Sequence, residues 1–193
     1  MKKVFLIFIL TLYSINVNAE NESKVYFAGG CFWCMEESFD KVEGVIKTTS
    51  GYSGGHVKNP KYKDVVKNTT GHYETLEITY NSNKTNFEKL LDDFWFNIDP
   101  FDAKGQFCDK GESYKSVVFY QNDQQKKIID RSIESIERTF KKPVVTYVKK
   151  FKEFYPAETY HQNYYEKNFI RYLMYKKACE REETLDKIWL EQQ

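Results

Sequence analysis

Residues 29–37 read Gly29-Gly30-Cys31-Phe32-Trp33-Cys34-Met35-Glu36-Glu37. Of all stretches of this chain, this one indicates the most about its chemistry. They follow a short apolar run, Val25-Tyr26-Phe27-Ala28, that predicts a β-strand, and they open a segment typical of a helix. A cysteine at a helix start lies beside unpaired N–H groups and the positive end of the helix dipole, which favours the thiolate. Two aromatic residues follow Cys31 directly. The stretch therefore predicts a reactive thiol at a strand-to-helix turn, beside an apolar pocket.

Residues 1–19 have the composition of a secretory signal peptide. Two lysines precede an apolar run that reaches Ile15, and Val17-Asn18-Ala19 offers small or β-branched residues where a signal peptidase cleaves. An uncleaved membrane anchor is the alternative, but the run is shorter than the roughly 20 residues of a spanning helix. We therefore predict an exported, periplasmic or extracytoplasmic protein whose mature chain, 20–193, is one domain without a membrane segment.

The charges of the chain are balanced and dispersed. There are 29 basic and 28 acidic side chains and a formal net charge of +1, which does not indicate binding to nucleic acid or to an anionic membrane. Aromatic residues make up 17% of the chain, and this excess predicts a site that holds a small apolar group in addition to a core. No repeat or low-complexity linker divides the sequence, and we expect a monomer.

Four cysteines in an exported chain suggest disulfides, and four allow three pairings. Cys31 and Cys34 are close in sequence, whereas Cys108 and Cys179 are isolated. A zinc site normally shows two close pairs, and haem attachment needs a histidine where Met35 stands. We therefore predict no metal and no prosthetic cofactor.

Strands and helices alternate along the rest of the chain. Leu76, Ile78 and Tyr80 alternate with polar residues and give the strongest half-buried strand signal. Several strands have polar faces, which favours an α+β two-layer sandwich, with a mixed or antiparallel sheet covered by helices, over a doubly wound parallel sheet. The segments predicted are strands over 45–50, 73–80, 116–120 and 144–148, helices over 85–97 (opened by a capping box at Thr85) and 123–140, a loop over 99–113, and an irregular stretch near 154–156 before C-terminal helices.

Three loops hold further polar residues capable of chemistry. Tyr62 follows Asn59-Pro60, Glu74 ends the turn Gly71-His72-Tyr73-Glu74, and a third loop runs from Asp109 to Tyr114. Each residue also has a purely structural interpretation, such as a surface contact or a turn cap. Composition alone leaves both interpretations open.

Seven stretches carry a resemblance to a known family. In chain order they are Gly30-Cys31-Phe32-Trp33, Gly51-Tyr52-Ser53-Gly54-Gly55, Asn59-Pro60-Lys61-Tyr62, Gly71-His72-Tyr73-Glu74, Asp99-Pro100, Asp109 to Tyr114, and Pro156-Ala157-Glu158-Thr159-Tyr160-His161-Gln162. Together they resemble the peptide methionine sulfoxide reductases of the A type, which act on the S epimer. The resemblance covers nearly the whole mature chain, and it implies a ferredoxin-like fold.

The resemblance also implies roles in reducing a sulfoxide, free or protein-bound. The reaction needs a nucleophile for sulfur, a proton for the departing oxygen, and contacts that hold the methyl group. The product on the nucleophile is a sulfenic acid, which a second thiol must resolve. The implied roles are nucleophile for Cys31, acid for Glu74, hydrogen bonding of the oxygen for Tyr62 and Tyr114, contact with the S-methyl for Phe32 and Trp33, and a supporting role for Asp109.

The resolving thiol is where this chain departs from many relatives. Cys34 stands where many have glycine, and no Gly-rich, cysteine-bearing tail follows the last helix. Cys34 lies one helical turn from Cys31, so we favour Cys34 as the resolving residue, with Cys108 or Cys179 as alternatives. We then expect Cys108 and Cys179 to bond to each other. An external thiol, from a thioredoxin-like protein or dithiothreitol, would reduce the enzyme.

Two other functions fit part of the sequence. A thioredoxin-like thiol–disulfide oxidoreductase also has a C-x-x-C motif at a helix start, but about 30 residues would precede the motif there. An exported binding module with two structural disulfides explains the number of cysteines. It does not explain why Phe32 and Trp33 follow Cys31. Assays of methionine sulfoxide reduction and of insulin disulfide reduction distinguish these functions.

Overall fold

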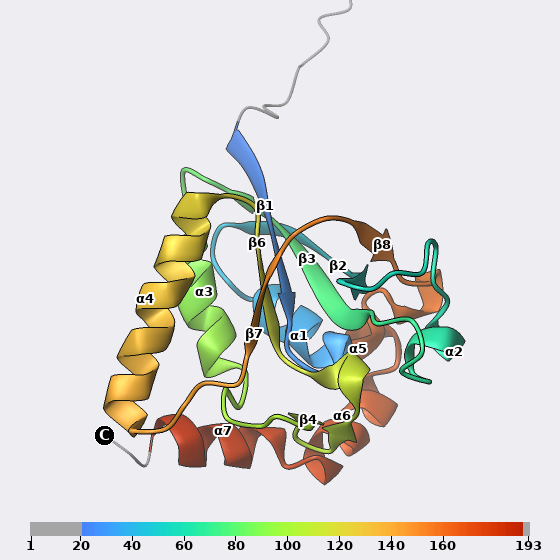
Figure 1. Cartoon of the computed structure of the whole chain (residues 1–193). Helices are drawn as coiled ribbons and strands as arrows, with labels where there is room; N and C mark the ends of the chain where they lie inside the picture. The colour runs from blue at the N-terminus through green and yellow to red at the C-terminus, as the bar shows by residue number, and fades with distance from the viewer. Residues whose placement is uncertain (1–20, 191–193) are drawn as a thin grey trace, which may run out of the picture.

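Six strands form one mixed sheet in the part of the chain that the computed structural model describes, residues 21–190 (Figure 1). The sheet order is β7-β6-β1-β3-β2-β8, with β1 (Glu22–Ala28), β2 (Val45–Ser53), β3 (Tyr73–Asn81), β6 (Val117–Tyr120), β7 (Tyr147–Lys150) and β8 (Phe154–Pro156). The helices are α1 (Phe32–Phe39), α2 (Tyr62–Val65), α3 (Phe87–Phe96), α4 (Asp123–Phe140), α5 (Tyr164–Lys167), α6 (Phe169–Ala178) and α7 (Arg181–Trp189). The predicted signal peptide lies outside the described residues. Within them, no helix has the length and apolar character needed to span a membrane.

Strand β1 lies inside the sheet because it pairs antiparallel with β3 on one side and with β6 on the other. Strand β2 pairs antiparallel with β3 and β8, whereas β6 and β7 are parallel. The alternation on β3 is confirmed, since Leu76, Ile78 and Tyr80 are all buried in the main core. Side chains two apart on a strand share a face. Glu74 therefore faces the same side as these core residues.

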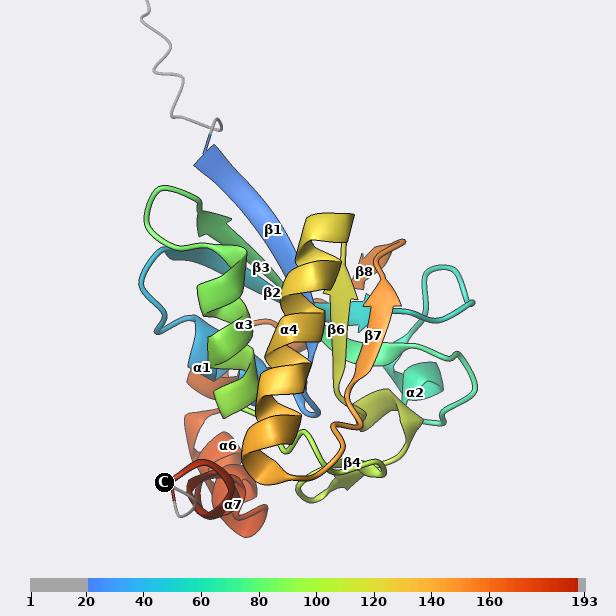
Figure 2. The same ribbon diagram turned by 60° about the vertical axis from the view of Figure 1, so that its left-hand side comes forward.

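Helices α3 and α4 lie side by side across one face of the sheet (Figure 2). The core between them and the sheet is aromatic, with the rings of Phe27 and Phe94 4.9 Å apart. On the other face, Phe151 stacks on Tyr26 at 3.8 Å. Helices α6 and α7 run along one end of the molecule (Figure 1), where Arg181 of α7 contacts Gly29 at the end of β1.

The helix boundaries follow local capping signals. Helix α4 spans the 18 residues predicted, and Asn122 caps it by accepting a hydrogen bond from the N–H of Gln125 at 2.9 Å. Helix α3 begins one residue later than the capping box indicates. Its cap is Asn86 rather than Thr85, since Asn86 accepts from the N–H of Lys89 at 2.9 Å.

Three segments differ from the prediction because their pairing depends on distant residues. The strand expected over 144–148 lies at 147–150, since parallel pairing with β6 begins where the N–H of Tyr147 donates to Ser116 O at 3.0 Å. The stretch expected to be irregular is strand β8. The loop 99–113 contains a hairpin of β4 (Gly105–Gln106) and β5 (Asp109–Lys110). The result is a mixed α and β architecture with a curled, mixed sheet.

Candidate active site

Two glycines shape the turn between β1 and α1. Gly30 has φ +80°, and a Cβ there would lie 2.5 Å from the Cβ of Gln106. A Cβ on Gly29 would lie 2.4 Å from the Sδ of Met35. Only glycine fits both positions without displacing a neighbour. The turn ends at Cys31, which is the N-cap residue of α1, as the sequence predicted.

Every residue that the sequence singled out for chemistry, except the resolving cysteines, lines one cavity of about 140 Å³. The side chains come from six places in the chain, including α1, α2, β3 and β5. They converge because β1 and β3 are paired and the loops at their ends meet. The lining residues are Cys31, Phe32, Trp33, Tyr62, Glu74, Asp109, Tyr114 and Tyr175.

Glu74 is the buried acid of this cavity. It is 2% exposed, and one of its oxygens accepts a hydrogen bond from the N–H of Phe32 at 3.1 Å. Burial raises the pKa of Glu74 well above its usual range, and the charge of Asp109 raises it further. Burial therefore favours the protonated form of Glu74, which has a proton to donate.

Tyr62 and Tyr114 are donors at the mouth of the cavity. Burial raises the pKa of Tyr62 to about 12 and that of Tyr114 above its usual value, so both hydroxyls stay protonated. The N–H of Tyr62 donates to Glu158 at 3.1 Å. The N–H of Ser113 donates to Asn68 at 2.9 Å and holds the loop before Tyr114. Backbone contacts thus fix both side chains independently of the cavity.

Cys31, the N-cap of α1, and Cys34 in its first turn share a hydrogen bond. Both are buried, at 4% exposed for Cys31 and 3% for Cys34, and both are free thiols. Burial, the hydrogen bond with Cys34 and the nearby carboxyl of Glu74 raise the pKa of Cys31. The same hydrogen bond lowers the pKa of Cys34. Burial therefore acts on Cys31 in the direction opposite to the helix dipole, which the sequence predicted to favour a thiolate there.

The family follows from the match across the described fold. The family model for peptide methionine sulfoxide reductase matches residues 23–193. This chain belongs to that family. It is 45% identical over 173 residues to the peptide methionine sulfoxide reductase MsrA of Bacillus licheniformis, covering 89% of this chain and 96% of the relative. It is 46% identical over 172 residues to that of Listeria monocytogenes, covering 88% and 97%.

A solved structure of the same family is also similar. Reduced Mxr1 from Saccharomyces cerevisiae superposes with a TM-score of 0.73 and 28% identity, over 81% of this chain and 91% of that chain. The likeness therefore extends over most of this methionine sulfoxide reductase.

The apolar wall of the reductase cavity is rigid. Phe32 is 1% exposed, and Trp33 stacks on Tyr164 with ring centroids 3.8 Å apart. The indole N–H of Trp33 donates to Nδ1 of His161 at 3.2 Å. Burial lowers the pKa of His161 to about 4, so its ring is neutral and can accept this bond. Stacking and this hydrogen bond therefore fix the orientation of the Trp33 ring in the wall.

The C-terminal helices close the other side of the reductase site. Tyr175 of α6 donates a hydrogen bond to Asp109, and Tyr172 packs on the cysteine pair while its hydroxyl donates to Glu37 at 2.6 Å. Sequence reasoning missed both tyrosines, since no local motif marks them. Helical spacing of aromatic residues over 164–175 was the available signal.

A disulfide joins Cys108 to Cys179, with Cα atoms 5.0 Å apart, and confirms the predicted pairing. It ties the loop before Asp109 to the end of α6. Among residues 21–190, one group of potential metal ligands lies close together, Cys108, Asp109 and Cys179. The disulfide uses both of its sulfurs, which leaves a single carboxylate and does not fit a metal.

Proposed function

We propose that this protein is a thiol-dependent reductase of methionine-S-sulfoxide, free and in proteins. The observation that carries the proposal is the cavity, which places the Cys31 sulfur, a protonated Glu74 and two tyrosine hydroxyls around one small apolar space. A sulfoxide has an electrophilic sulfur, a basic oxygen and a methyl group. Each of these has a matching partner in the cavity. The free thiols of Cys31 and Cys34 can supply the two electrons of the reduction.

The first step joins the Cys31 sulfur to the sulfoxide sulfur. Glu74 gives its proton to the sulfoxide oxygen, and Tyr62 and Tyr114 donate hydrogen bonds to that oxygen as charge develops on it. Phe32 and Trp33 hold the S-methyl. The hydroxyl then passes from the substrate sulfur to the Cys31 sulfur. The substrate S–O bond and the S–S bond of the first step break, an S–O bond forms on Cys31, methionine leaves with two more electrons, and Cys31 becomes a sulfenic acid. The proton of the Cys31 thiol passes to Glu74 and replaces the proton that Glu74 gave to the sulfoxide oxygen. Asp109, bonded to Tyr175, supports the arrangement.

Cys34 completes the reaction. Its sulfur attacks the sulfenic sulfur of Cys31, the S–O bond breaks, and water leaves as the Cys31–Cys34 disulfide forms. A dithiol outside the protein, of the thioredoxin type or dithiothreitol, attacks this disulfide, is itself oxidised, and returns both cysteines to thiols. The Cys108–Cys179 disulfide already occupies the other two sulfurs, which supports Cys34 in this role.

The test is a dithiothreitol-driven assay on the two epimers of methionine sulfoxide. We expect reduction of the S epimer only, because one chiral cavity admits one arrangement of methyl, oxygen and lone pair. Cys31→Ser should abolish it, since a hydroxyl without an activating base is a poor nucleophile. Cys108→Ser is the matched control, since its sulfur lies outside the cavity. Equal rates on both epimers would refute the proposal. Reduction of insulin disulfides at a rate comparable to that on the sulfoxide would also refute it and would favour a general oxidoreductase.

We further propose that residues 1–19 direct export and are removed, so that the enzyme repairs oxidised exported proteins as a monomer. The basic start and the short apolar run support this. N-terminal sequencing of the protein from fractionated cells tests it, with Glu20 expected at the terminus in the extracytoplasmic fraction. An intact Met1 in the cytoplasm would contradict it.

We also infer a ferredoxin-like relationship for the central strands. Support comes from the order β6-β1-β3-β2, with every neighbouring pair antiparallel and with α1 and α3 connecting strands that are not neighbours. Strands β7 and β8 extend this unit at its two edges. An experimental structure with a different order for these four strands would overturn the assignment.

A further inference from the structure

Arg181 is a buried cation beside the catalytic turn. It is the first residue of α7 and is 4% exposed. Its guanidinium donates to the carbonyl of Asn97 at 2.6 Å and to the carbonyl of Gly29 at 3.4 Å, and it contacts Sδ of Met35 at 3.5 Å. All three partners are neutral. Within residues 21–190, no ion pair includes Arg181.

The partners of Arg181 lie on both sides of the cysteine pair. Gly29 comes two residues before Cys31, and Met35 directly follows Cys34. The guanidinium therefore contacts both the end of β1 and the first turn of α1. A buried charge without a counter-ion costs free energy, and a negative charge formed nearby would offset part of that cost.

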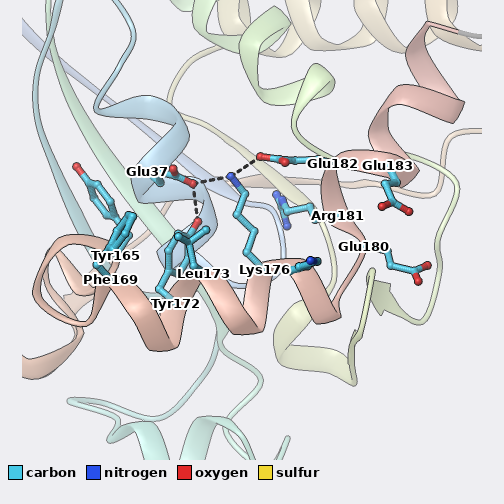
Figure 3. A pocket seen from close by; sticks show the side chains of 11 residues that line it. Glu37, Tyr165, Phe169, Tyr172, Leu173, Lys176, Glu180, Arg181, Glu182 and Glu183 are labelled. Carbon is cyan, nitrogen blue, oxygen red and sulfur yellow. Dashed lines mark hydrogen bonds and ion pairs between the residues drawn. The ribbon is translucent and has the colours of Figure 1, made fainter.

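An aromatic ring next to the disulfide also contacts the guanidinium. The ring of Phe107 lies 4.4 Å from it, and Phe107 is next to Cys108 in the sequence. Cys179, two residues before Arg181, is bonded to Cys108. In Figure 3 the guanidinium points away from the carboxylates of Glu180 and Glu183. The disulfide thus fixes both the ring and the helix start that orient this cation.

We propose that Arg181 is a positioning residue for the resolving step, stabilising the Cys34 thiolate that attacks the sulfenic acid on Cys31. The inference rests on the proposed function. The Cys34 sulfur forms the S–S bond, the S–O bond of the sulfenic acid breaks, and the leaving hydroxide takes a proton to become water. Arg181 neither gives nor takes a proton, and its charge acts through space.

The other groups around Cys34 do not supply a positive charge. Cys31 and Tyr172 hydrogen-bond to it, and the carboxyl of Asp109 opposes a thiolate. Tyr175 is a neutral phenol that faces both cysteines and Asp109. The Cys31 hydrogen bond is the main cause that lowers the pKa of Cys34, and the charge of Arg181 acts in the same direction. At Asp109 the charge of Arg181 offsets part of the burial that raises the pKa of that carboxyl. Lys176 is engaged with Glu37 and Glu182.

The experiment compares Arg181→Met, Arg181→Lys and Arg181→Gln, with Arg171→Met on the exposed side of α6 as the matched control. Thiolate absorbance is measured against pH in protein with reduced Cys31 and Cys34 and an intact Cys108–Cys179 bond. Disulfide formation is then timed after one equivalent of sulfoxide. We expect Arg181→Met to raise the pH midpoint of the first thiolate by about one unit and to slow disulfide formation about tenfold at pH 7, with recovery at high pH. Arg181→Lys should restore most of both.

An unshifted midpoint in Arg181→Met, or a Lys variant as impaired as the Met variant, would overturn the proposal and leave Arg181 a packing residue. If Arg181→Met does not fold, the Lys and Gln variants make the same comparison of charged against neutral side chains. Failure of the proposed function looks different, since the wild-type protein would then form no Cys31–Cys34 disulfide after one turnover.

Discussion

Replacing Glu36 by glutamine should change how the stability of this protein depends on pH. Glu36 follows Met35 on α1 and is 0% exposed, and neither of its oxygens accepts a well-formed hydrogen bond. Burial raises the pKa of Glu36 from 4.5 to about 7, and the N–H groups of Asn163 and Tyr164 offset only part of this effect. The folded protein therefore holds a proton there that the unfolded chain releases.

The sign and size follow from this difference in pKa. Below pH 4.5 the carboxyl is neutral in both states and destabilises neither. Between pH 4.5 and about 7 only the unfolded chain ionises, so each pH unit lowers the free energy of unfolding by about 1.4 kcal/mol. The loss levels off near 3 kcal/mol above pH 7. Glu36→Gln removes the ionisation, so its stability relative to wild type should rise by that amount from pH 4.5 to 8.

Urea unfolding between pH 4.5 and 8, with the Cys108–Cys179 bond intact in both proteins, measures this directly. The neighbouring Glu37 is the matched control with the opposite sign. Burial acts on it too, but bonds from Lys176 and Lys41 outweigh burial and hold the pKa of Glu37 near 2. Glu37→Gln should therefore lose stability relative to wild type above pH 4.5, and the difference should vanish as the pH falls toward 2. Parallel pH curves for wild type and Glu36→Gln would refute the reasoning.

Three further predictions concern the reductase site. Glu74→Gln keeps the shape of the acid without its proton, so turnover should fall about 10²-fold with little change in substrate binding. A rate within twofold of wild type would mean that Glu74 takes no part in the reaction. Cys34→Ser should release one equivalent of methionine and then stall with oxidised Cys31, which mass spectrometry of the quenched protein would detect. Continued turnover would assign resolution to another thiol. Cys179→Ser opens a bridge between residues 71 apart and should cost about 4 kcal/mol in urea unfolding, and it should affect stability more than turnover.

Local sequence determined much of this protein because some interactions involve only near neighbours. Helix α4 begins and ends where its cap and periodicity place it, and the burial of Leu76 and Ile78 follows from alternation alone. The glycines before Cys31 define a turn that no other residue fits. The candidate site could also be predicted from sequence, since its residues stand in short motifs in a known family order. These signals need no knowledge of distant contacts.

Tertiary structure decided what depends on residues far apart in the chain. Strand β8 exists because β2 offers it an unpaired edge, and β7 starts where β6 can pair with it. The sequence predicted a thiolate at Cys31, but burial and the carboxyl of Glu74 act against ionisation there. Glu74 lies 43 residues from Cys31 in sequence, and the fold places both in the same cavity. Tyr175 and Arg181 reach the site only because α6 and α7 fold back over α1. Desolvation and charge act over distances in space, and only the folded chain sets those distances.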